Sequence, residues 1–326
     1  MNPSSSSEAI LGLDVAKASV QAELQLSAGS KVRFAFGNNT SGFNKLERVL
    51  AQHPAALVYA GLEATGSYSQ ALAGWLHAHG HRVSLLNPRR VKDYARSAGL
   101  RNKTDELDAA VIADFIRAHR ERLPLWQPLA PQVRQLQELV RRRHQLEGLL
   151  LAERNRLEGT TATVRASIQR LVEVLSAEKA SLEKAMAKQI RSHPELLRNH
   201  QLLCTIKGIG SLTATVLLAE MATPAQVQRA RQAAALAGLC PRREQSGSSV
   251  RRHKGIGKEG SRYLRKALYM PALVAIKHNA PLRHFAQKLQ GAGKSQMAII
   301  GAIMRKLIHI SFGVLKHQQP FNPSLA

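Results

Sequence analysis

The first 122 residues show a fixed order of short strand and helix signals, and this order narrows the folds open to the chain more than any other feature. Apolar residues alternate with polar ones over 20–26 and over 32–36, which is the period of a half-buried strand. Together with the apolar run at 9–13, these segments predict three consecutive antiparallel strands. The remaining signals alternate between helix (40–50, 67–79 and 104–120) and strand (56–62 and 82–86).

Three strands followed by helix, strand, helix, strand and helix is the order of ribonuclease-H-like α/β domains. We therefore expect residues 9–122 to form one such domain. Residues 1–8 are rich in serine and are expected to be a short disordered tail. A chain of 326 residues has room for one or two further domains.

A leucine pattern follows the N-terminal region after a proline-punctuated linker that begins at residue 123. Leucines with three-four spacing run over 136–157, and apolar residues resume this spacing over 164–182 after the break at Gly159. We expect two long helices folded back as a hairpin within residues 123–199. Polar residues at other heptad positions leave two interpretations equally open, a helical spacer and a self-association coiled coil.

Residues 200–326 are expected to form a mainly α-helical domain, with helices on both sides of a glycine turn and over 264–277 and 296–315. The turn, Ile206-Lys207-Gly208-Ile209-Gly210, has the form of a helix-hairpin-helix. In such a turn Lys207 and the amides of Gly208 and Gly210 would meet a phosphate without reading base sequence. A bare glycine turn is common, so this prediction depends on the basic residues around it.

The charge of the chain predicts a polyanionic partner. Lys and Arg number 47 against 22 Asp and Glu, which gives a net charge of +25. The excess is concentrated in residues 201–326, which hold 19 basic and 3 acidic residues, whereas a merely solvated surface usually mixes both signs. Nucleic acid is the most abundant cellular polyanion. Its expected contacts, besides the glycine turn, are Lys103, Arg242, Arg243, Arg251, Arg252 and Lys254.

Four carboxylates from three elements of the N-terminal region form a candidate metal site. Asp14 and Glu63 each follow an expected strand, where a side chain can point into a cleft. Asp105 and Asp108 are three residues apart, so a helix would carry both on one face, about 5 to 6 Å apart at Cβ. Such oxygen ligands suit Mg²⁺, and two such ions can clamp the attacking and leaving oxygens of phosphoryl transfer. Taken singly, each acid has a structural explanation, Asp105 as a helix cap and Asp14 or Glu63 as a solvated loop residue.

A serine-rich segment, 246–249, lies between the two arginine pairs of the C-terminal region. A free serine hydroxyl needs a base or a metal to activate it, so chemistry alone favours phosphate binding over nucleophilic attack by Ser246. The flanking arginines would hold a scissile phosphate and stabilise its charge in the transition state. His253 is the only imidazole nearby, and its partner is not evident.

The apolar runs and the cysteines of the chain indicate where in the cell the protein acts. Uninterrupted apolar runs reach only eight residues, short of the roughly twenty that span a bilayer, so no membrane partner is expected. Cys204 and Cys240 lack C-x-x-C partners, which argues against a zinc site or a disulfide framework and favours a reducing cytoplasm.

Two long motifs in the right order resemble the insertion-sequence 110 family of transposases, which is related to the Piv-type DNA invertases. Lys207 departs from the proline that commonly precedes Gly-Ile-Gly in this family. The N-terminal motif, the DEDD pattern of the family, comprises Gly12-Leu13-Asp14-Val15-Ala16-Lys17, Glu63-Ala64-Thr65-Gly66 and Arg101-Asn102-Lys103-Thr104-Asp105-Glu106-Leu107-Asp108-Ala109. The C-terminal motif comprises Gly238-Leu239-Cys240-Pro241-Arg242-Arg243, Ser246-Gly247-Ser248-Ser249-Val250-Arg251 and Leu264-Arg265-Lys266-Ala267-Leu268-Tyr269-Met270-Pro271-Ala272.

The resemblance implies a RuvC-like domain, a coiled-coil connector and a transposase domain with a catalytic serine. Asp14, Glu63, Asp105 and Asp108 would bind Mg²⁺, and Ser246 would form a transient phosphoserine bond with DNA. Family members look like homo-oligomers, from dimer to tetramer, whose active sites combine the RuvC-like domain of one subunit with the transposase domain of another. A noncoding RNA from the element guides them by pairing with both target and donor DNA.

We therefore expect an RNA-guided DNA recombinase that mobilises its own insertion sequence. Two alternatives stay open. A metal-only nuclease resembling a junction resolvase would attack with activated water and form no covalent adduct. A non-catalytic RNA- or DNA-binding protein would keep its cellular activity when Asp14 or Asp105 is replaced by Asn.

Overall fold

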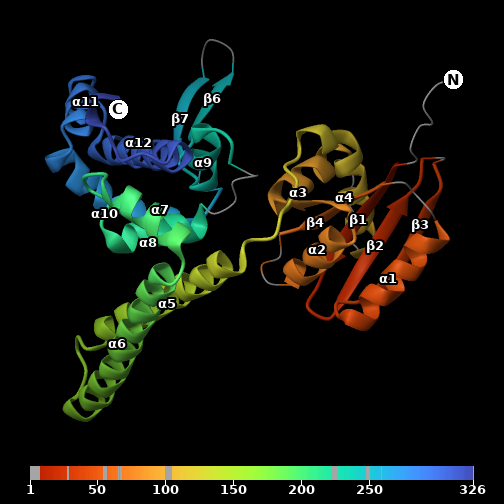
Figure 1. The fold of residues 1–326 in the computed structure, drawn as a ribbon, viewed down its shortest axis with the longest axis horizontal. Helices are drawn as coiled ribbons and strands as arrows, with labels where there is room; N and C mark the ends of the chain where they lie inside the picture. The colour runs from red at the N-terminus through yellow and green to blue at the C-terminus, as the bar shows by residue number, and fades with distance from the viewer. Residues whose placement is uncertain are drawn as a thin grey trace. The chain divides into compact units, whose positions relative to one another are not determined.

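The computed structural model of the protein describes most of the chain and divides it into two compact units, Met1–Pro128 and Leu129–Ala326 (Figure 1). The expected tail lies outside the described residues except for Glu8, which begins the first strand. The described residues are 8–27, 29–53, 57–64, 66, 68–99, 105–221, 227–246, 250–257 and 259–325. Only the backbone is described at 105–107, 242–246, 250–254 and 325.

The first unit is a mixed α/β domain, and every strand and helix expected over 9–122 is present with bounds within two residues of the prediction. Its elements are β1 (Glu8–Val15), β2 (Ser19–Gln25), β3 (Lys31–Gly37), α1 (Thr40–Gln52), β4 (Leu57–Glu63), α2 (Tyr68–Ala78), β5 (Arg82–Leu86), α3 (Pro88–Ser97), α4 (Asp105–His119) and the 3-10 turn η1 (Arg120–Arg122). The sheet order is β3-β2-β1-β4-β5, with β1–β2 and β2–β3 antiparallel and β1–β4 and β4–β5 parallel. This order is consistent with a ribonuclease-H-like domain.

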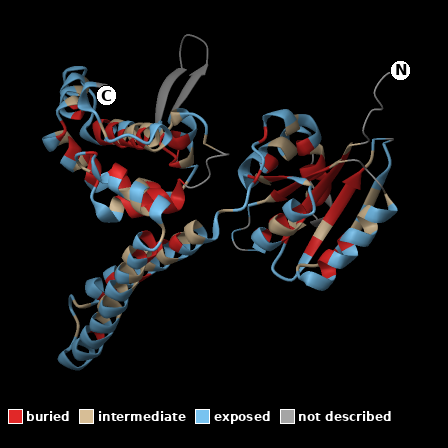
Figure 2. Ribbon diagram, viewed as in Figure 1, coloured by how far each residue is buried: buried red, intermediate tan, exposed pale blue. Residues whose placement is uncertain are grey.

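Residues 9–13 of the central strand β1 are apolar and buried, as its colour in Figure 2 shows, and helices pack on both faces of the strand. Leu11 and Leu13 belong to a core that includes Leu46 of α1 and Leu72 of α2. Ile10, which points to the other face, belongs to a core formed with α3 and α4. The domain therefore has helices on both sides of one sheet.

The helix α3 was not expected from the sequence. Asn87 caps it by accepting a hydrogen bond from the amide of Arg89 at 2.9 Å, and Pro88 occupies its first position. An Asn-Pro start is a known helix signal, and Val91, Tyr94 and Ala95 have the i, i+3, i+4 spacing of a helix face that packs on the core. The sequence therefore contains the signals of this helix, which were missed among its charged residues.

The second unit is mainly helical. The expected helical hairpin is formed by α5 and α6, which lie side by side in Figure 1, and the expected glycine turn connects α7 and α8. The elements are α5 (Pro131–Arg156), α6 (Ala162–Arg191), α7 (Pro194–Cys204), α8 (Ser211–Glu220), α9 (Ala230–Leu236), β6 (Pro241–Ser246), β7 (Val250–Ile256), α10 (Arg262–His278), α11 (Ala280–Gly291), α12 (Gln296–His317) and the 3-10 turn η2 (Pro323–Leu325).

Within the described residues, α12 is the one helix whose length and composition would allow it to cross a membrane. Its apolar side chains, including Ile303, Leu307 and Ile308, are buried in the core of the second unit. Arg305 and Lys306 lie near its middle. These features identify α12 as the central core helix of this unit.

The antiparallel pair β6 and β7 was also not expected from the sequence, which predicts only a loop around Ser246. Strand signals come from alternating apolar residues, and these strands carry arginine, glutamate and glutamine in their place. Residues 247–249, which complete the serine-rich segment, lie outside the described residues.

Candidate active site

Asp14 and Glu63 stand side by side at the carboxyl end of the sheet. The parallel strands β1 and β4 are in register with Leu13 opposite Leu62, so the next residue on each strand is the acid. Neighbouring strands are about 4.8 Å apart, and residues in register share a face. Two of the four expected acids are therefore adjacent by backbone geometry.

A pair of glycines in these two strands creates the groove in which α4 lies. Gly12 is in register with Gly61, and both face the helix. A Cβ atom on Gly12 would stand 2.2 Å from the carbonyl oxygen of Ala109, and one on Gly61 would stand 2.0 Å from the side chain of Ile116. A larger residue at Gly12 would meet the backbone of α4 and force the helix away from the sheet, whereas one at Gly61 would first displace the side chain of Ile116.

The helix α4 runs antiparallel to β1. Arg120, just beyond its C-terminus, forms a 2.7 Å ion pair with Glu8 at the start of β1, whereas Ala109 near its N-terminus contacts Gly12. Asp14 lies two residues beyond Gly12, about 7 Å along the strand. Asp105 lies one helical turn before Ala109, about 6 Å in the same direction. The first turn of α4 is therefore level with Asp14.

Helical periodicity places the positions of both acids of α4 in line with buried residues of the helix. Asp108 lies one turn before the fully buried Ile112, and Asp105 one turn before the buried Ala109. Asp14 shares a strand face with Gly12, so all three sequence segments that carry the acids meet at one edge of the domain. The backbone thus brings together the four positions that the sequence singled out.

Carboxylates are the hard oxygen donors that Mg²⁺ prefers, so the chemistry of this donor set fits such an ion. Among the residues whose side chains are described, no three possible ligands stand close enough together to hold a metal ion. The side chain of Asp105 is outside that set, and Lys103 lies outside the described residues altogether.

The helix α3 carries basic residues that were not singled out from the sequence. Because β5 is parallel to β4, its end at Leu86 meets the edge where the acids lie, and α3 begins two residues later. Arg90 and Lys92 of α3 are exposed, and Arg90 lies 5.5 Å from the ring centre of Phe115 in α4. Phe115 is ten residues, about 15 Å, along α4 from Asp105, so this contact places Arg90 away from the acids.

A polar network ties α4 to the sheet. The side-chain amide of Gln25 donates hydrogen bonds of 2.8 Å to Glu23 and to Asp114, and Arg117 donates to the Gln25 oxygen at 2.9 Å. Arg33 donates to the fully buried Glu23 at 2.7 Å. These bonds join β2, β3 and α4, and so help to fix the register of the helix that carries Asp105 and Asp108.

The protonation of Glu23 depends on this network. Burial by itself would raise the pKa of this carboxyl, but hydrogen bonds from Gln25 and Arg33, together with the charges of Lys31 and Arg33, outweigh it. The pKa of Glu23 is therefore held below its usual value, and the group stays ionised at neutral pH.

Ser246 is the last residue of β6 and is paired with Val250 of β7. The expected arginines lie along the same two strands, Arg242 and Arg243 on β6 and Arg251 and Arg252 on β7, with Lys254 further along β7. In the ladder Glu244 is opposite Arg252 and Arg243 is opposite His253. The hairpin therefore collects the expected serine, arginines and Lys254 on one two-stranded element.

The glycine turn between α7 and α8 packs against α10. Gly208 has a φ of +111°, which favours glycine, and a Cβ there would stand 3.0 Å from the carbonyl oxygen of Pro271. The side-chain amide of Asn279 donates to the carbonyl oxygen of Lys207 at 3.2 Å. Lys207 itself is exposed, and Gly210 precedes the first residue of α8.

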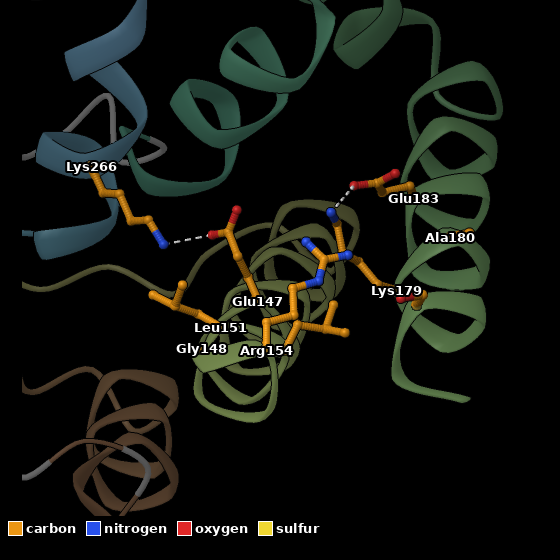
Figure 3. Close-up of a pocket in the computed structure, with 10 residues that line it drawn as sticks. Glu147, Gly148, Leu151, Arg154, Lys179, Ala180, Glu183 and Lys266 are labelled. Atoms are coloured by element: carbon orange, nitrogen blue, oxygen red, sulfur yellow. Dashed lines mark hydrogen bonds and ion pairs between the residues drawn. The ribbon is translucent and has the colours of Figure 1, made fainter. Parts of the chain in front are cut away.

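A hollow of about 470 Å³ lies between α5, α6 and Lys266 of α10 (Figure 3). Lys266 donates to Glu147 at 2.7 Å and Arg143 donates to Glu183 at 2.7 Å, so most of the charges at its rim are paired. None of the residues that line it is one of the expected site residues. The ion pair of Lys266 with Glu147 at this hollow joins α10 to α5. The hollow is not part of the candidate site.

Comparison with known proteins gives matches over nearly the whole chain. A family model described as a transposase matches residues 11–164, and a second, described as the transposase IS116/IS110/IS902 family, matches residues 200–287. The first match contains all four acids, and the second contains Ser246 and the glycine turn.

Curated relatives agree with these models. The pilin gene-inverting protein of Moraxella bovis is 34% identical over 319 residues, which cover 97% of this chain and 98% of the relative. A probable family 20 transposase of Pseudomonas aeruginosa is 28% identical over 83% of this chain and 87% of its own length. The transposase of insertion sequence element IS1111A from Coxiella burnetii is 27% identical over 60% of each chain. Family models and relatives together show that this chain belongs to the IS110 family of transposases, and that it is a DNA recombinase.

Proposed function

We propose that this transposase cuts and rejoins DNA through a covalent bond between Ser246 and a DNA phosphate, assisted by Mg²⁺ at Asp14, Glu63, Asp105 and Asp108. The observation that carries the proposal is the register of β1 and β4, which sets Asp14 beside Glu63, with the first turn of α4 level with them. A bound Mg²⁺ would neutralise charge on the phosphate and lower the pKa of an oxygen attached to it.

The reaction is a transesterification. The Ser246 oxygen attacks phosphorus and loses its proton to a base, while the bond from phosphorus to one deoxyribose oxygen breaks and that oxygen leaves as a hydroxyl. The bond energy is kept in the serine ester, so a DNA hydroxyl can attack it in turn and regenerate the serine without a nucleotide cofactor. Arg242, Arg243, Arg251 and Arg252 would bind the phosphate and its growing negative charge.

We further propose that an element-encoded RNA supplies the sequence specificity and pairs with target and donor DNA. The supporting feature is the excess of basic residues in 201–326, which suits phosphate backbones of either nucleic acid. Lys103, Lys207, Lys254 and the amides of Gly208 and Gly210 would add phosphate contacts. The protein would act in the cytoplasm, bound to DNA, as a homo-oligomer of two to four subunits.

The test is a denaturing-gel search for a covalent protein–DNA adduct, with Mg²⁺ and the RNA and DNA of the native locus. Wild type should form the adduct and Ser246→Ala should not, whereas Ser211→Ala, at the start of α8 in the same unit, should behave as wild type. Asp14→Asn should lose both adduct and recombination.

Two results would contradict the proposal. Mg²⁺-dependent cutting by Ser246→Ala, with no adduct from either protein, would favour a metal-only nuclease that attacks with water. Normal activity of Asp14→Asn in cells would favour a non-catalytic nucleic-acid-binding role. Omitting the RNA tests guidance separately, because an unguided recombinase would keep its site preference without it.

A further inference from the structure

One face of α10 exposes large apolar side chains. Tyr269, Met270 and Val274 are 37%, 62% and 42% exposed, whereas Leu268 and Ala272 on the other side of the helix are fully buried. Met270 and Val274 are four residues apart and share a helix face, and Tyr269 lies next to Met270, about 100° around the helix, so the three form a broad exposed stripe along this side of α10. A single exposed apolar residue is ordinary, but a contiguous group marks an interaction surface.

Cationic residues border this stripe at both ends. Arg262 lies two turns before Tyr269, and Lys277 lies one turn after Val274, about 22 Å from Arg262 along the helix. No acidic residue occurs among the 17 residues of α10, and within the described residues neither cation has a carboxylate partner. Lys266, in the same stripe, donates to Glu147, so its charge is partly neutralised.

The glycine turn lies on the buried side of α10, where Gly208 faces Pro271 and Ala275. Asn279, which follows α10 and is 1% exposed, donates to the carbonyl oxygen of Lys207 and so holds the turn beside this end of the helix. Lys207 is exposed, but the turn that carries it is on the opposite side of α10 from Met270 and Val274. We call Arg262, Tyr269, Met270, Val274 and Lys277 the α10 face.

We propose that the α10 face docks DNA whose bases are unpaired or parted, with phosphates at Arg262 and Lys277 and bases against Tyr269 and Met270. The inference rests on the proposed function because it takes DNA as the substrate of this chain. Aromatic side chains provide stacking platforms for bases, and exposed apolar side chains can act as wedges between base steps. A second copy packed face to face suits this surface less well, because Arg262 and Lys277 of one copy would meet the same cations of the other, with no acidic residue on α10 to pair with them.

The experiment compares the full-length chain with a double variant, Tyr269→Ala with Met270→Ala, by fluorescence anisotropy on a single-stranded DNA oligonucleotide and on its duplex. Stacking on an aromatic residue is worth about 1–3 kcal/mol per base, so the Kd for single-stranded DNA should rise roughly 5- to 150-fold. The Kd for duplex should change much less. Alanine suits helix interiors, and circular dichroism should show an unchanged fold.

The matched control is Met297→Ala on α12, because this apolar residue is 65% exposed on a helix of the same unit outside the helical hairpin. It should bind both DNAs as wild type does. In a salt titration the apolar double variant should keep the wild-type slope, whereas Lys277→Gln should lower the slope on single-stranded DNA by about 0.7, the value for one lost phosphate contact.

Equal affinity of the double variant and wild type for single-stranded DNA would overturn the inference and leave the recombinase function standing. A changed molar mass in light scattering, with unchanged DNA affinity, would instead assign the α10 face to contact between copies. Failure of wild type to bind either DNA would remove the proposed function together with this inference.

Discussion

The acids and the serine of this transposase are held by opposite kinds of structure. Asp14 and Glu63 lie at the ends of buried parallel strands, and Asp105 and Asp108 lie on the helix that packs closely on two glycines of those strands. The serine ends a strand of a two-stranded hairpin whose strands carry charged residues, and the described apolar contacts of the hairpin are at its base, where Cys240 and Ile256 meet the helical core. An isolated two-stranded hairpin is marginally stable in water.

The difference indicates how the two halves of the chemistry would be controlled. A site fixed by core packing keeps its geometry before any substrate arrives. If the arginines of the hairpin bind nucleic acid as proposed, charge-assisted hydrogen bonds to phosphate would add to its stability. We therefore expect the acids to be preorganised by the fold and the serine to be positioned by nucleic acid.

The largest effect that this comparison predicts is at Gly12. Gly12→Ala places a methyl group 2.2 Å from the carbonyl oxygen of Ala109, so α4 must move and the unit should lose about 3 kcal/mol of unfolding free energy. Recombination should fall below detection because Asp105 and Asp108 move with the helix. Thermal unfolding and a recombination assay measure the two effects.

The control for this prediction is Gly74→Ala in α2 of the same unit, where the nearest atom to a new Cβ is 4.0 Å away. This substitution should leave activity unchanged and raise stability by up to about 1 kcal/mol, because alanine favours a helix. An active, stable Gly12→Ala protein would show that α4 does not need its close contact with β1.

An intermediate effect is expected at Glu23. Its pKa is lowered in the folded protein, so its ionised form stabilises the fold above its unfolded pKa near 4.5, and this contribution is lost as pH falls through the folded value. Glu23→Gln should therefore lower the free energy of unfolding by about 1–2 kcal/mol at pH 7. This difference should shrink as the solution is acidified below pH 4.5. Urea unfolding over a pH series measures this.

Glu47→Gln on the exposed side of α1 serves as the control and should change stability very little at any pH. Suppose that Glu23→Gln lowered the free energy of unfolding by the same amount at pH 3.5 and at pH 7. The hydrogen-bond network around Glu23 would then stabilise the fold through packing and hydrogen bonding, and not through the charge of Glu23.

The smallest effect is expected at the junction of α5 and α10. Lys266 is 54% exposed at its side chain and Glu147 is 36% exposed, so solvent screens their ion pair. Lys266→Gln should lower the unfolding free energy by less than about 1 kcal/mol, and high salt should erase the difference. If calorimetry showed that Lys266→Gln loses several kcal/mol of unfolding free energy, the contact between α5 and α10 would be as important to the second unit as Gly12 is to the first.

Much of the first unit was predictable because local patterns and tertiary packing agree there. Each strand expected between 9 and 86 is present in the structure. The apolar residues of these strands, alternating or continuous, are the ones that a sheet covered by helices can bury. The hairpin of β6 and β7 escaped prediction because charged residues occupy it, and its cross-strand hydrogen bonds leave no apolar period. The helix α3 could have been predicted from Asn87-Pro88 and from the helical spacing of Val91, Tyr94 and Ala95.

The sequence by itself determined the family, the order of the N-terminal strands and the identity of the candidate residues, because these depend on residue types and their spacing. Only the tertiary structure decided that Asp14 stands beside Glu63, and that α4 runs back along β1 to bring Asp105 and Asp108 level with them. The direction and register of two distant segments depend on which side chains fit between them. Here that was settled by Gly12 and Gly61, which have no side chain at all.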